Sequence, residues 1–172
     1  MKNKLIVVDI NDRPIGEISK TDAHAKGILH RAFSVFIFNT EGKWLLQKRA
    51  LHKYHSAGLW SNTCCGHPNV GEETTLAAEK RLFEEMGMHV KVNPIFEMTY
   101  RAVLKNGLIE HEFDHIFTGI SDDMPIINND EVMSYQYLSN LELREKISAN
   151  PEEFTEWFKM LFERVVMEVE KG

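Results

Sequence analysis

The chain has 172 residues, of which 43% are hydrophobic and 27% charged, and its formal net charge is −6 at pH 7. A chain of this length can bury a sizeable core, and we expect residues 1–172 to form a single domain. The negative charge excludes a general affinity for nucleic acid or anionic membranes. Any anion that the protein binds must therefore meet a local cluster of basic residues.

The first apolar run, residues 5–8, is too short for a signal-peptide core or a membrane span. We therefore expect a cytoplasmic protein with no membrane partner. Cys64 and Cys65, the only cysteines, are neighbours and cannot link distant parts of the fold. We expect free thiols, of which one is a candidate reactive group and the other a buried, inert side chain.

The first part of the chain is dominated by β-type patterns. Residues 19–27 are polar and have no clear periodicity, so no element is assigned there. Residues 50–60 are expected to form a loop. Runs of β-branched and aromatic residues predict strands over 5–9, 15–18, 30–38, 44–49 and 61–65.

The second part of the chain contains both helical and strand patterns. Residues 73–86 have helical periodicity, and Gly87 follows at the position where helices end. Strands are predicted over 90–104, with a break at residues 93–94, over 108–119 after the Asn106-Gly107 turn, and over 131–138. Helices are predicted over 141–147 and 154–169, the latter after Asn150 as cap and Pro151 in the first turn. The apolar stripe of the first helix is predicted to be Leu76, Ala78, Leu82, Phe83 and Met86.

This order of elements predicts an α/β (α+β) fold with a mixed β-sheet core and flanking helices. Between the fifth strand and the first long helix, Gly66, Pro68 and Gly71 mark a loop whose main-chain N–H groups can approach a ligand such as phosphate. In the helix, Arg81 and Glu85 lie one turn apart. Taken alone, they predict a surface ion pair worth a few tenths of a kcal/mol.

Several residues are candidate metal ligands. His24, His30 and His67 come from three separate segments, and Glu110, Glu112 and Asp114 alternate along one strand so that they share a face. Taken singly, such a histidine is more often a surface or hydrogen-bonded residue, and alternating acids are usually solvated. The sequence contains none of the short His/Cys ligand motifs that would join them.

The loop and helix resemble the signature of the Nudix superfamily. Its pattern is Gly, five residues, Glu, seven residues, Arg-Glu-aliphatic, one residue, Glu-Glu, one residue, Gly-aliphatic. Lys80-Arg81 replaces the central Arg-Glu, whose glutamate belongs to the metal cluster in Nudix hydrolases. The resemblance thus implies a chain that binds a diphosphate and keeps it intact. The positions that fit are Gly66, Glu72, Leu82, Glu84, Glu85, Gly87 and Met88.

A closer resemblance is to the type I isopentenyl diphosphate isomerases. It is carried by Cys65-Gly66-His67-Pro68 before the helix, by Glu110-His111-Glu112 after the hairpin turn, and by the pair His24 and His30. His55 and Ala57 differ from the residues expected in this family, and the interval between His24 and His30 is one residue short. Supporting matches are Lys20, Arg49-Ala50-Leu51, Lys53, Gly58-Leu59-Trp60-Ser61-Asn62, Tyr100-Arg101-Ala102, Asn128-Asn129-Asp130-Glu131-Val132 and Trp157.

The family's metal site, carried over position by position, implies one Mn²⁺ or Zn²⁺ (or Mg²⁺) ion, since mixed imidazole and carboxylate ligands suit a first-row ion. Glu85 would instead meet a Mg²⁺ ion that arrives with the substrate diphosphate. The implied ligands of the first ion are His24, His30, His67, Glu110 and Glu112.

The resemblance also implies the reaction, which moves the double bond of isopentenyl diphosphate to give dimethylallyl diphosphate through a tertiary carbocation. Cys65 and Glu112 would transfer the protons, with Tyr100 assisting. Trp157 would turn its π face toward the cation, although by pattern alone it is one apolar residue of a helix. The basic residues implied to hold the diphosphate are Lys20, Arg49, Lys53 and Arg81.

Three functions therefore compete. An isomerase exchanges hydrogen with solvent and releases no phosphate, a Nudix pyrophosphohydrolase releases phosphate or pyrophosphate from a nucleoside diphosphate derivative, and a non-catalytic module only binds a metal or nucleotide. Arg81 in place of the helix glutamate favours the isomerase. The expected partner is a small allylic-type diphosphate, and the sequence gives no indication of an oligomeric state.

Overall fold

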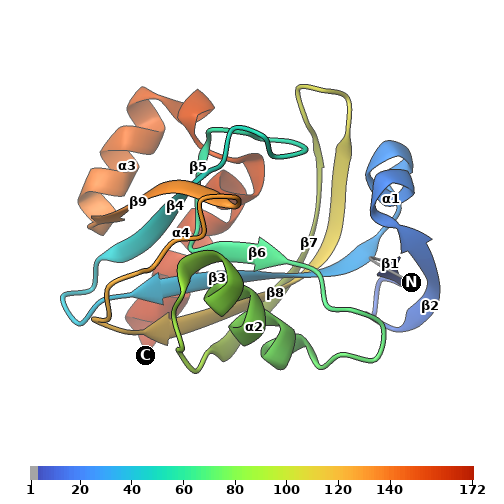
Figure 1. The fold of residues 1–172 in the computed structure, drawn as a ribbon, viewed down its shortest axis with the longest axis horizontal. Helices are drawn as coiled ribbons and strands as arrows, with labels where there is room; N and C mark the ends of the chain where they lie inside the picture. The colour runs from blue at the N-terminus through green and yellow to red at the C-terminus, as the bar shows by residue number, and fades with distance from the viewer. Residues whose placement is uncertain (1–3) are drawn as a thin grey trace.

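The computed structural model describes residues 4–172, so residues 1–3 of the expected domain lie outside the described part. A nine-stranded sheet forms the centre of the molecule, and helices pack on it from both sides (Figure 1). The strands are β1 (Lys4–Val8), β2 (Pro14–Ser19), β3 (His30–Phe38), β4 (Trp44–Arg49), β5 (Trp60–Ser61), β6 (Cys64–Gly66), β7 (Asn93–Val103), β8 (Ile109–Ile120) and β9 (Val132–Leu138). The helices are α1 (Lys20–Lys26), α2 (Thr74–Met86), α3 (Asn140–Ala149), the short 3₁₀ helix η1 (Pro151–Glu153) and α4 (Glu156–Lys171).

Strand β3 is the axis of the sheet. Along one edge it pairs in parallel with β8 over its whole length, from His30 opposite Glu112 to Phe38 opposite Ile120. Along its other edge it pairs in turn with β1, β6 and β4, all antiparallel. Residues of β6 and β8 therefore lie on the two sides of β3, which brings Cys65 and Glu112 to the same part of the sheet.

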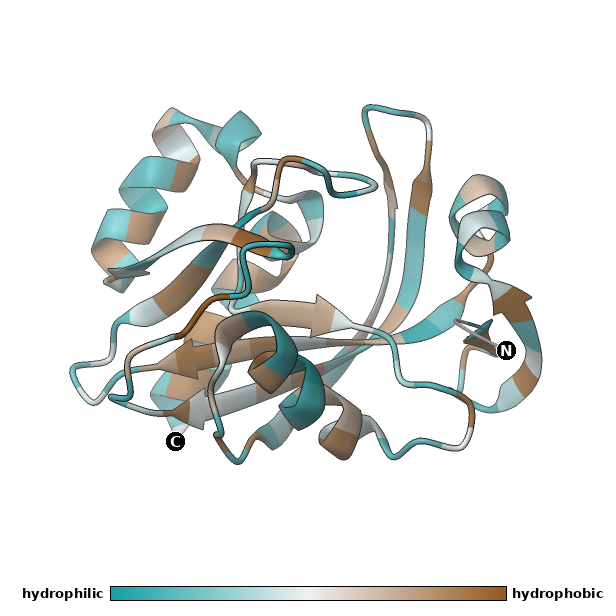
Figure 2. Ribbon diagram, viewed as in Figure 1, coloured by the Kyte–Doolittle hydropathy of each residue, from teal (hydrophilic) through white to brown (hydrophobic). Residues whose placement is uncertain are grey.

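Alternation along β3 divides the core into two layers. Phe33, Val35 and Ile37 face α2, whereas Phe36 and Phe38 face α4. Figure 2 shows brown stretches in the strands that lie between these two helices. Because side chains alternate along a strand, the residues that precede Phe36 on the α4 side, including Ser34 and His30, point toward the same face.

The predicted fold class is confirmed, and most predicted elements lie within two residues of the observed ones. The strand predicted over residues 90–104 begins only at Asn93, where the break was predicted, and its register shifts between Pro94 and Phe96. The predicted strand over residues 61–65 is instead two short strands, β5 and β6. Among the helices of residues 4–172, none is long and apolar enough to cross a bilayer.

Three helical predictions need correction. No element was assigned over residues 19–27, yet α1 forms there, with Ser19 accepting the Asp22 N–H at its start and Gly27 in a left-handed conformation at its end. Leu76 and Phe83 were predicted to face the core but are 58% and 48% exposed, whereas the carboxylate of Glu85 is buried. The last helix begins only at Glu156, because Pro151 starts the separate turn η1.

Gly87 ends α2 at a φ of 64°, and a Cβ atom there would lie 2.5 Å from the Ile126 carbonyl oxygen. We expect Gly87→Ala to destabilise the fold by more than the roughly 1–2 kcal/mol that a positive φ alone costs a non-glycine residue. Gly107→Ala is the control, since Gly107 has a φ of 80° but no neighbouring atom within 4 Å of a new Cβ. Denaturant unfolding measures both, and equal losses would contradict the steric account.

Candidate active site

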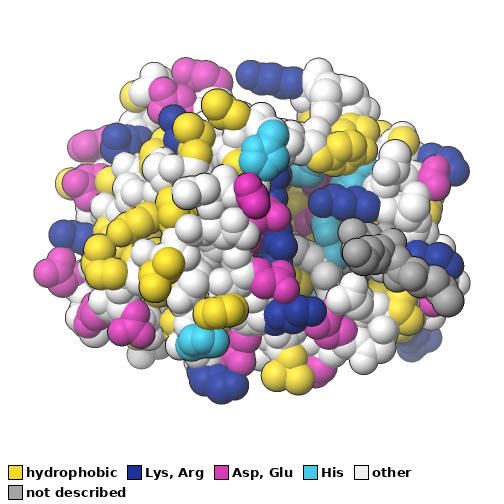
Figure 3. All heavy atoms as spheres, in the orientation of Figure 1, with side chains coloured by type: hydrophobic (Ala, Val, Ile, Leu, Met, Phe, Trp, Pro, Cys, Tyr) yellow, Lys and Arg dark blue, Asp and Glu magenta, His cyan; other side chains and the backbone are white. Residues whose placement is uncertain are grey.

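A pocket of about 480 Å³ is lined by residues of the sheet, of the helices α1, α2 and α4, and of the loop that follows β4. This loop and the β7–β8 hairpin project from the same side of the sheet (Figure 1), and Asn106 of the hairpin donates to the Tyr54 carbonyl of the loop. Figure 3 shows basic, acidic and histidine side chains gathered around a hollow on this face. The residues proposed from the sequence that line it are Lys20, Arg49, Lys53, Cys65, His67, Arg81, Glu85, Tyr100, Glu110, Glu112 and Trp157.

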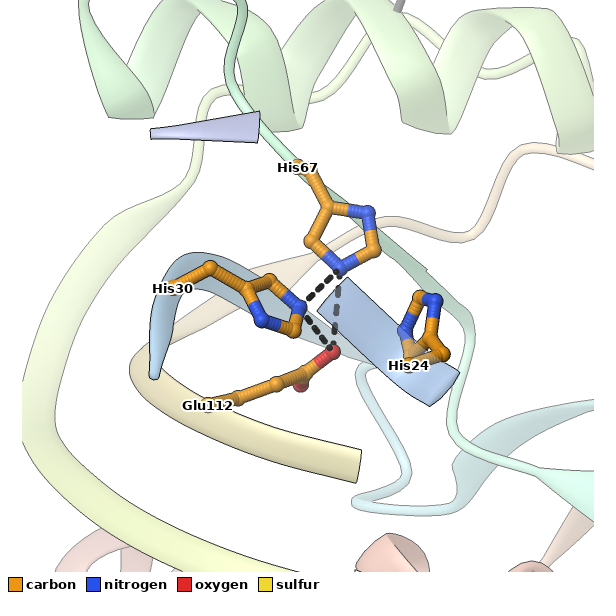
Figure 4. A group of neighbouring side chains, drawn as sticks. All are labelled: His24, His30, His67 and Glu112. Atoms are coloured by element: carbon orange, nitrogen blue, oxygen red, sulfur yellow. Dashed lines mark hydrogen bonds and ion pairs between the residues drawn. The ribbon is translucent and has the colours of Figure 1, made fainter. Parts of the chain in front are cut away.

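Four ligand atoms converge at the inner end of the pocket. One atom each of His24, His30, His67 and Glu112 lies within 4.8 Å of the other three (Figure 4). His67 Nε2 is 3.0 Å from Glu112 Oε1 and 3.2 Å from His30 Nε2. Glu110, the fifth predicted ligand, places Oε2 3.5 Å from His24 Nε2. The structure therefore brings four of the five predicted ligands into one group, and Glu110 adjoins this group through His24.

Local structure fixes the two innermost imidazole rings. His24 Nδ1 lies 2.8 Å from the Lys20 carbonyl one helical turn earlier, and His30 Nδ1 lies 2.8 Å from the Ile28 carbonyl. Because a carbonyl oxygen only accepts, each Nδ1 carries a proton and donates it. Each Nε2 is thereby turned inward, which is how metal-binding histidines are commonly oriented.

In both Glu112 and Glu110, one carboxylate oxygen contacts a neighbouring side chain and the other faces the histidines. Tyr100 donates its hydroxyl to Glu112 Oε2 at 2.7 Å, so Oε1 remains for the imidazoles. In Glu110, Oε1 lies 2.9 Å from a nitrogen of His55, whereas the buried Oε2 has no hydrogen-bond partner. His24 Nε2 is likewise buried without a partner. Unpartnered buried polar atoms are costly, and these two face each other, so the donor set fits a divalent metal ion.

Burial and mutual charge shift the pKa values within this cluster. Burial lowers the pKa of His67 to about 4, although Glu112 opposes this shift. Burial also disfavours the charged form of His30, but hydrogen bonding and the charge of Glu112 leave its pKa raised. Burial alone would raise the pKa of Glu112, yet bonds from His30 and His67 hold it well below its usual range. Glu112 is therefore an ionised carboxylate at neutral pH.

The two cysteines have different surroundings, as strand alternation requires. Cys64 is buried in the core beneath α2, whereas Cys65 lines the pocket. Cys65 Sγ donates to Asn62 Oδ1 at 3.2 Å and lies 3.7 Å from the Ser34 hydroxyl. Burial raises the pKa of Cys65, followed by the nearby charge of Asp114. Cys65 is therefore a protonated thiol that can hold a proton at the pocket wall.

An aromatic wall stands beside these groups. Trp157 of α4 is buried, and its indole N–H donates to Asn62 Oδ1 at 3.2 Å, the same oxygen that Cys65 reaches. The Arg49 guanidinium lies 5.3 Å from the centre of the Trp157 ring. The ring of Tyr100 is also buried, and burial followed by the charge of Glu112 raises its pKa well above 10. The phenol therefore keeps its proton.

Basic residues also line the pocket. Arg81 donates to Glu85 Oε1 at 2.8 Å and to Glu131 Oε2 at 2.8 Å, and Lys53 pairs with the same Glu131 oxygen. Glu85 also accepts from the Gln47 amide at 2.6 Å. Burial, opposed by Glu85 and reinforced by neighbouring cations, lowers the pKa of Lys53 to about 8. The cations are thus held close together by carboxylates that an anionic ligand can replace.

Sequence reasoning missed three residues that the structure places at the site. Asn62 connects Cys65 to Trp157, Glu131 bridges Lys53 and Arg81, and His55 contacts Glu110. Asn62 and Glu131 stood within the family matches but were given no role. His55 was noted only as a departure from the family. No local sequence pattern indicates such contacts, because each joins segments far apart in the chain.

Comparison with known proteins places this site in a family. The model of the NUDIX domain matches residues 28–158. The crystal structure of a Deinococcus radiodurans protein is similar in fold, with a TM-score of 0.71 and 20% identity over 86% of this chain and 90% of that one. The crystal structure of a MutT protein from Methanosarcina mazei is also similar, with a TM-score of 0.66 and 18% identity over 81% of this chain and 94% of that one. At these identities the likeness concerns the fold alone.

Curated relatives are much more similar in sequence. An isopentenyl-diphosphate Delta-isomerase of Pectobacterium atrosepticum is 53% identical over 94% of this chain and 90% of its own length. The corresponding values are 52%, 94% and 91% for isomerase 2 of Photorhabdus laumondii, and 47%, 98% and 96% for the enzyme of Burkholderia multivorans. The chain therefore belongs to the isopentenyl-diphosphate Delta-isomerase family of the Nudix superfamily.

Proposed function

We propose that the chain isomerises isopentenyl diphosphate to dimethylallyl diphosphate, a step of isoprenoid biosynthesis, with Cys65 and Glu112 as the proton-transfer pair. One group adds a proton to the terminal carbon of the double bond, which leaves a tertiary carbocation, and the other removes a proton from the carbon nearer the diphosphate. Atoms balance, because one proton enters and one leaves. The observation that carries this proposal is that both groups line one pocket from strands on opposite sides of β3.

The protonation states support the pair. Burial keeps Cys65 as a thiol, and the imidazoles keep Glu112 as a carboxylate, so one group holds a proton and the other can accept one. Tyr100, hydrogen-bonded to Glu112, is placed to assist that transfer. Trp157 and the buried Tyr100 ring supply π faces and exclude water, which would otherwise capture the carbocation.

The diphosphate would be held by Lys20, Arg49, Lys53 and Arg81, which line the pocket. The Arg guanidiniums can bind phosphate oxygens in a bidentate manner. Glu85 would hold a Mg²⁺ ion that comes with the diphosphate, since Mg²⁺ prefers few carboxylates and several phosphate oxygens. Both Glu85 oxygens already accept hydrogen bonds, so this requires Arg81 to release the carboxylate and turn to the phosphates.

The inner cluster would hold one divalent ion, with Mn²⁺ or Zn²⁺ favoured over Mg²⁺ by its imidazoles. When bound, such an ion would lower the proton affinity of Glu112 and keep the ligand set rigid. The proposed ligands are His24, His30, His67, Glu110 and Glu112.

The hydrolase alternative finds less support. The helix position that supplies a metal-binding glutamate in Nudix hydrolases is Arg81, whose guanidinium pairs with Glu84, Glu85 and Glu131. A cation at this position favours binding of the diphosphate over activation of a water against it.

A cytoplasmic location and a single domain over residues 1–172 remain predictions.

Cys65→Ala and Glu112→Gln should each lower turnover of isopentenyl diphosphate by at least about 100-fold, because each removes a proton-transfer group. Cys64→Ala is the matched control: it removes the neighbouring thiol, which lies in the core, and should keep near-normal turnover. Turnover is measured by NMR of the product, and calorimetry checks that both variants still bind dimethylallyl diphosphate. Near-normal turnover in both variants would contradict the assignment.

Lys53 should make substrate capture sensitive to pH. With its pKa lowered to about 8, its ammonium loses its proton as pH rises through 8, so kcat/KM should fall above that pH. Lys53→Arg keeps a positive charge and should move the decline to higher pH. A pH profile measured on both proteins checks this, and an unshifted decline in Lys53→Arg would exclude Lys53 as its cause.

Adding Zn²⁺ or Mn²⁺ to chelator-treated protein should raise Tm, because the ion binds only the folded ligand set. At 100 times Kd the gain is about 2.7 kcal/mol, or roughly 5–10 °C for a chain of this size. His67→Ala should abolish most of the shift, whereas His89→Ala, at an exposed position after α2, should retain it. Calorimetric scans give the values, and equal shifts in both variants would argue against this ligand set.

A further inference from the structure

The loop between β4 and β5 carries a buried histidine, His55, beside the proposed metal ligands. Its side chain is 8% exposed, although the neighbouring Tyr54 and His52 lie at the surface. His55 Nε2 is 2.9 Å from Glu110 Oε1. Ligand-type atoms of His24, His55 and Glu110 lie within 4.8 Å of one another. His55 is therefore a further histidine of the cluster, beyond those that family resemblance assigns.

The contacts of Glu110 indicate what His55 does. One carboxylate oxygen, Oε1, is taken by His55, whereas Oε2 is buried without a hydrogen-bond partner and faces His24 Nε2, which also has none. In the tautomer that carries its proton on Nε2, His55 donates to Glu110 Oε1, because the carboxylate only accepts. Glu110 Oε2 and His24 Nε2 are then the two atoms without a hydrogen-bond partner.

The second carboxylate has a matching donor. The Tyr100 hydroxyl holds Glu112 Oε2 at 2.7 Å and leaves Oε1 facing the imidazoles. In both glutamates, therefore, one oxygen is fixed by a protein donor and the other is turned toward the centre of the cluster. Such outer donors orient metal-binding carboxylates and raise metal affinity.

Other contacts fix His55 within its loop. Arg49 donates to the His55 carbonyl at 3.1 Å, and the imidazole packs edge-on against Trp157, with ring centres 5.8 Å apart. Ser56, whose hydroxyl lies 3.3 Å from His55 Nδ1, has a φ of 52°. This conformation is uncommon for a residue with a side chain, and it indicates a loop held in one shape by its surroundings.

We propose that His55 is a positioning residue that fixes Glu110 for the metal and joins the metal centre to the loop that carries Lys53. This inference rests on the metal centre proposed above. Through its ring, His55 touches a metal ligand, and through its backbone it is held by Arg49, a proposed diphosphate ligand. His55 thereby links the metal ligand Glu110 to Arg49.

The test is the affinity of the full chain for Zn²⁺, measured by competition with a chromophoric chelator in the absence of substrate. His55→Ala should bind Zn²⁺ about 10–100-fold more weakly, the usual loss when an outer donor is removed. His55→Gln, whose amide nitrogen can donate from about the same position, should recover most of the affinity. His52→Ala, an exposed histidine in the same loop, should match the wild type.

Unchanged Zn²⁺ affinity in His55→Ala would overturn the proposal. Affinity as weak in His55→Gln as in His55→Ala would overturn the role as a hydrogen-bond donor. If the alanine variant does not fold, His55→Gln decides alone: affinity within about threefold of the wild type supports donation, and a loss of about tenfold or more rejects it. A wild-type chain that binds no Zn²⁺ would instead contradict the metal centre itself.

Discussion

The constraint on which the site depends is the burial of several imidazole nitrogens and carboxylate oxygens that face one another. His30 Nε2 and His67 Nε2 are 3.2 Å apart, and both lie next to Glu112 Oε1. Backbone carbonyls hold the outer nitrogens of His24 and His30, so these rings cannot simply turn away. Buried polar groups this close together are costly unless they share a positive charge. The cluster thus supports the proposed cation site, and the register between β3 and β8, with His30 opposite Glu112, brings two of its residues together.

The pocket also brings several basic side chains together, although the net charge of the protein is −6. Glu85 and Glu131 hold Arg81 and Lys53 close together and offset their mutual repulsion. We propose that a diphosphate takes the place of these carboxylates. Glu112 belongs to the inner cluster, and Cys65 lines the same pocket. We propose that the pocket binds the polar end of the substrate at its basic residues and keeps the hydrocarbon end near Cys65, Glu112 and the aromatic rings.

Much of the fold followed from local patterns. The strand over residues 30–38 and the helix before Gly87 have strong periodicity, and both are present with nearly the predicted bounds. Helix α1 was missed because its seven residues are too few to show a period, although Ser19 and Gly27 mark its two ends. Leu76 and Phe83 were misplaced because the helix buries alanines and Glu85 instead, a choice set by the sheet beneath it.

The site was less accessible to sequence reasoning. Alternation along a strand shows that Cys64 and Cys65 point to opposite sides, but only family resemblance selected Cys65 for the pocket. Glu110 and Glu112 were placed on one face by alternation, and the structure agrees. The contacts of His55 and Glu131 join segments separated by 55 and 50 residues or more, respectively. Such contacts depend on how the loops fold over the sheet, and no spacing in the sequence encodes them.

X-ray absorption spectroscopy of the Zn²⁺-loaded protein would decide whether the cluster binds a metal, because it reports the atoms around the ion in solution. We expect one bound ion whose ligands are imidazole nitrogens and carboxylate oxygens, with the imidazole scattering reduced in His30→Ala. A spectrum with sulfur ligands, or one without imidazole scattering, would contradict this expectation.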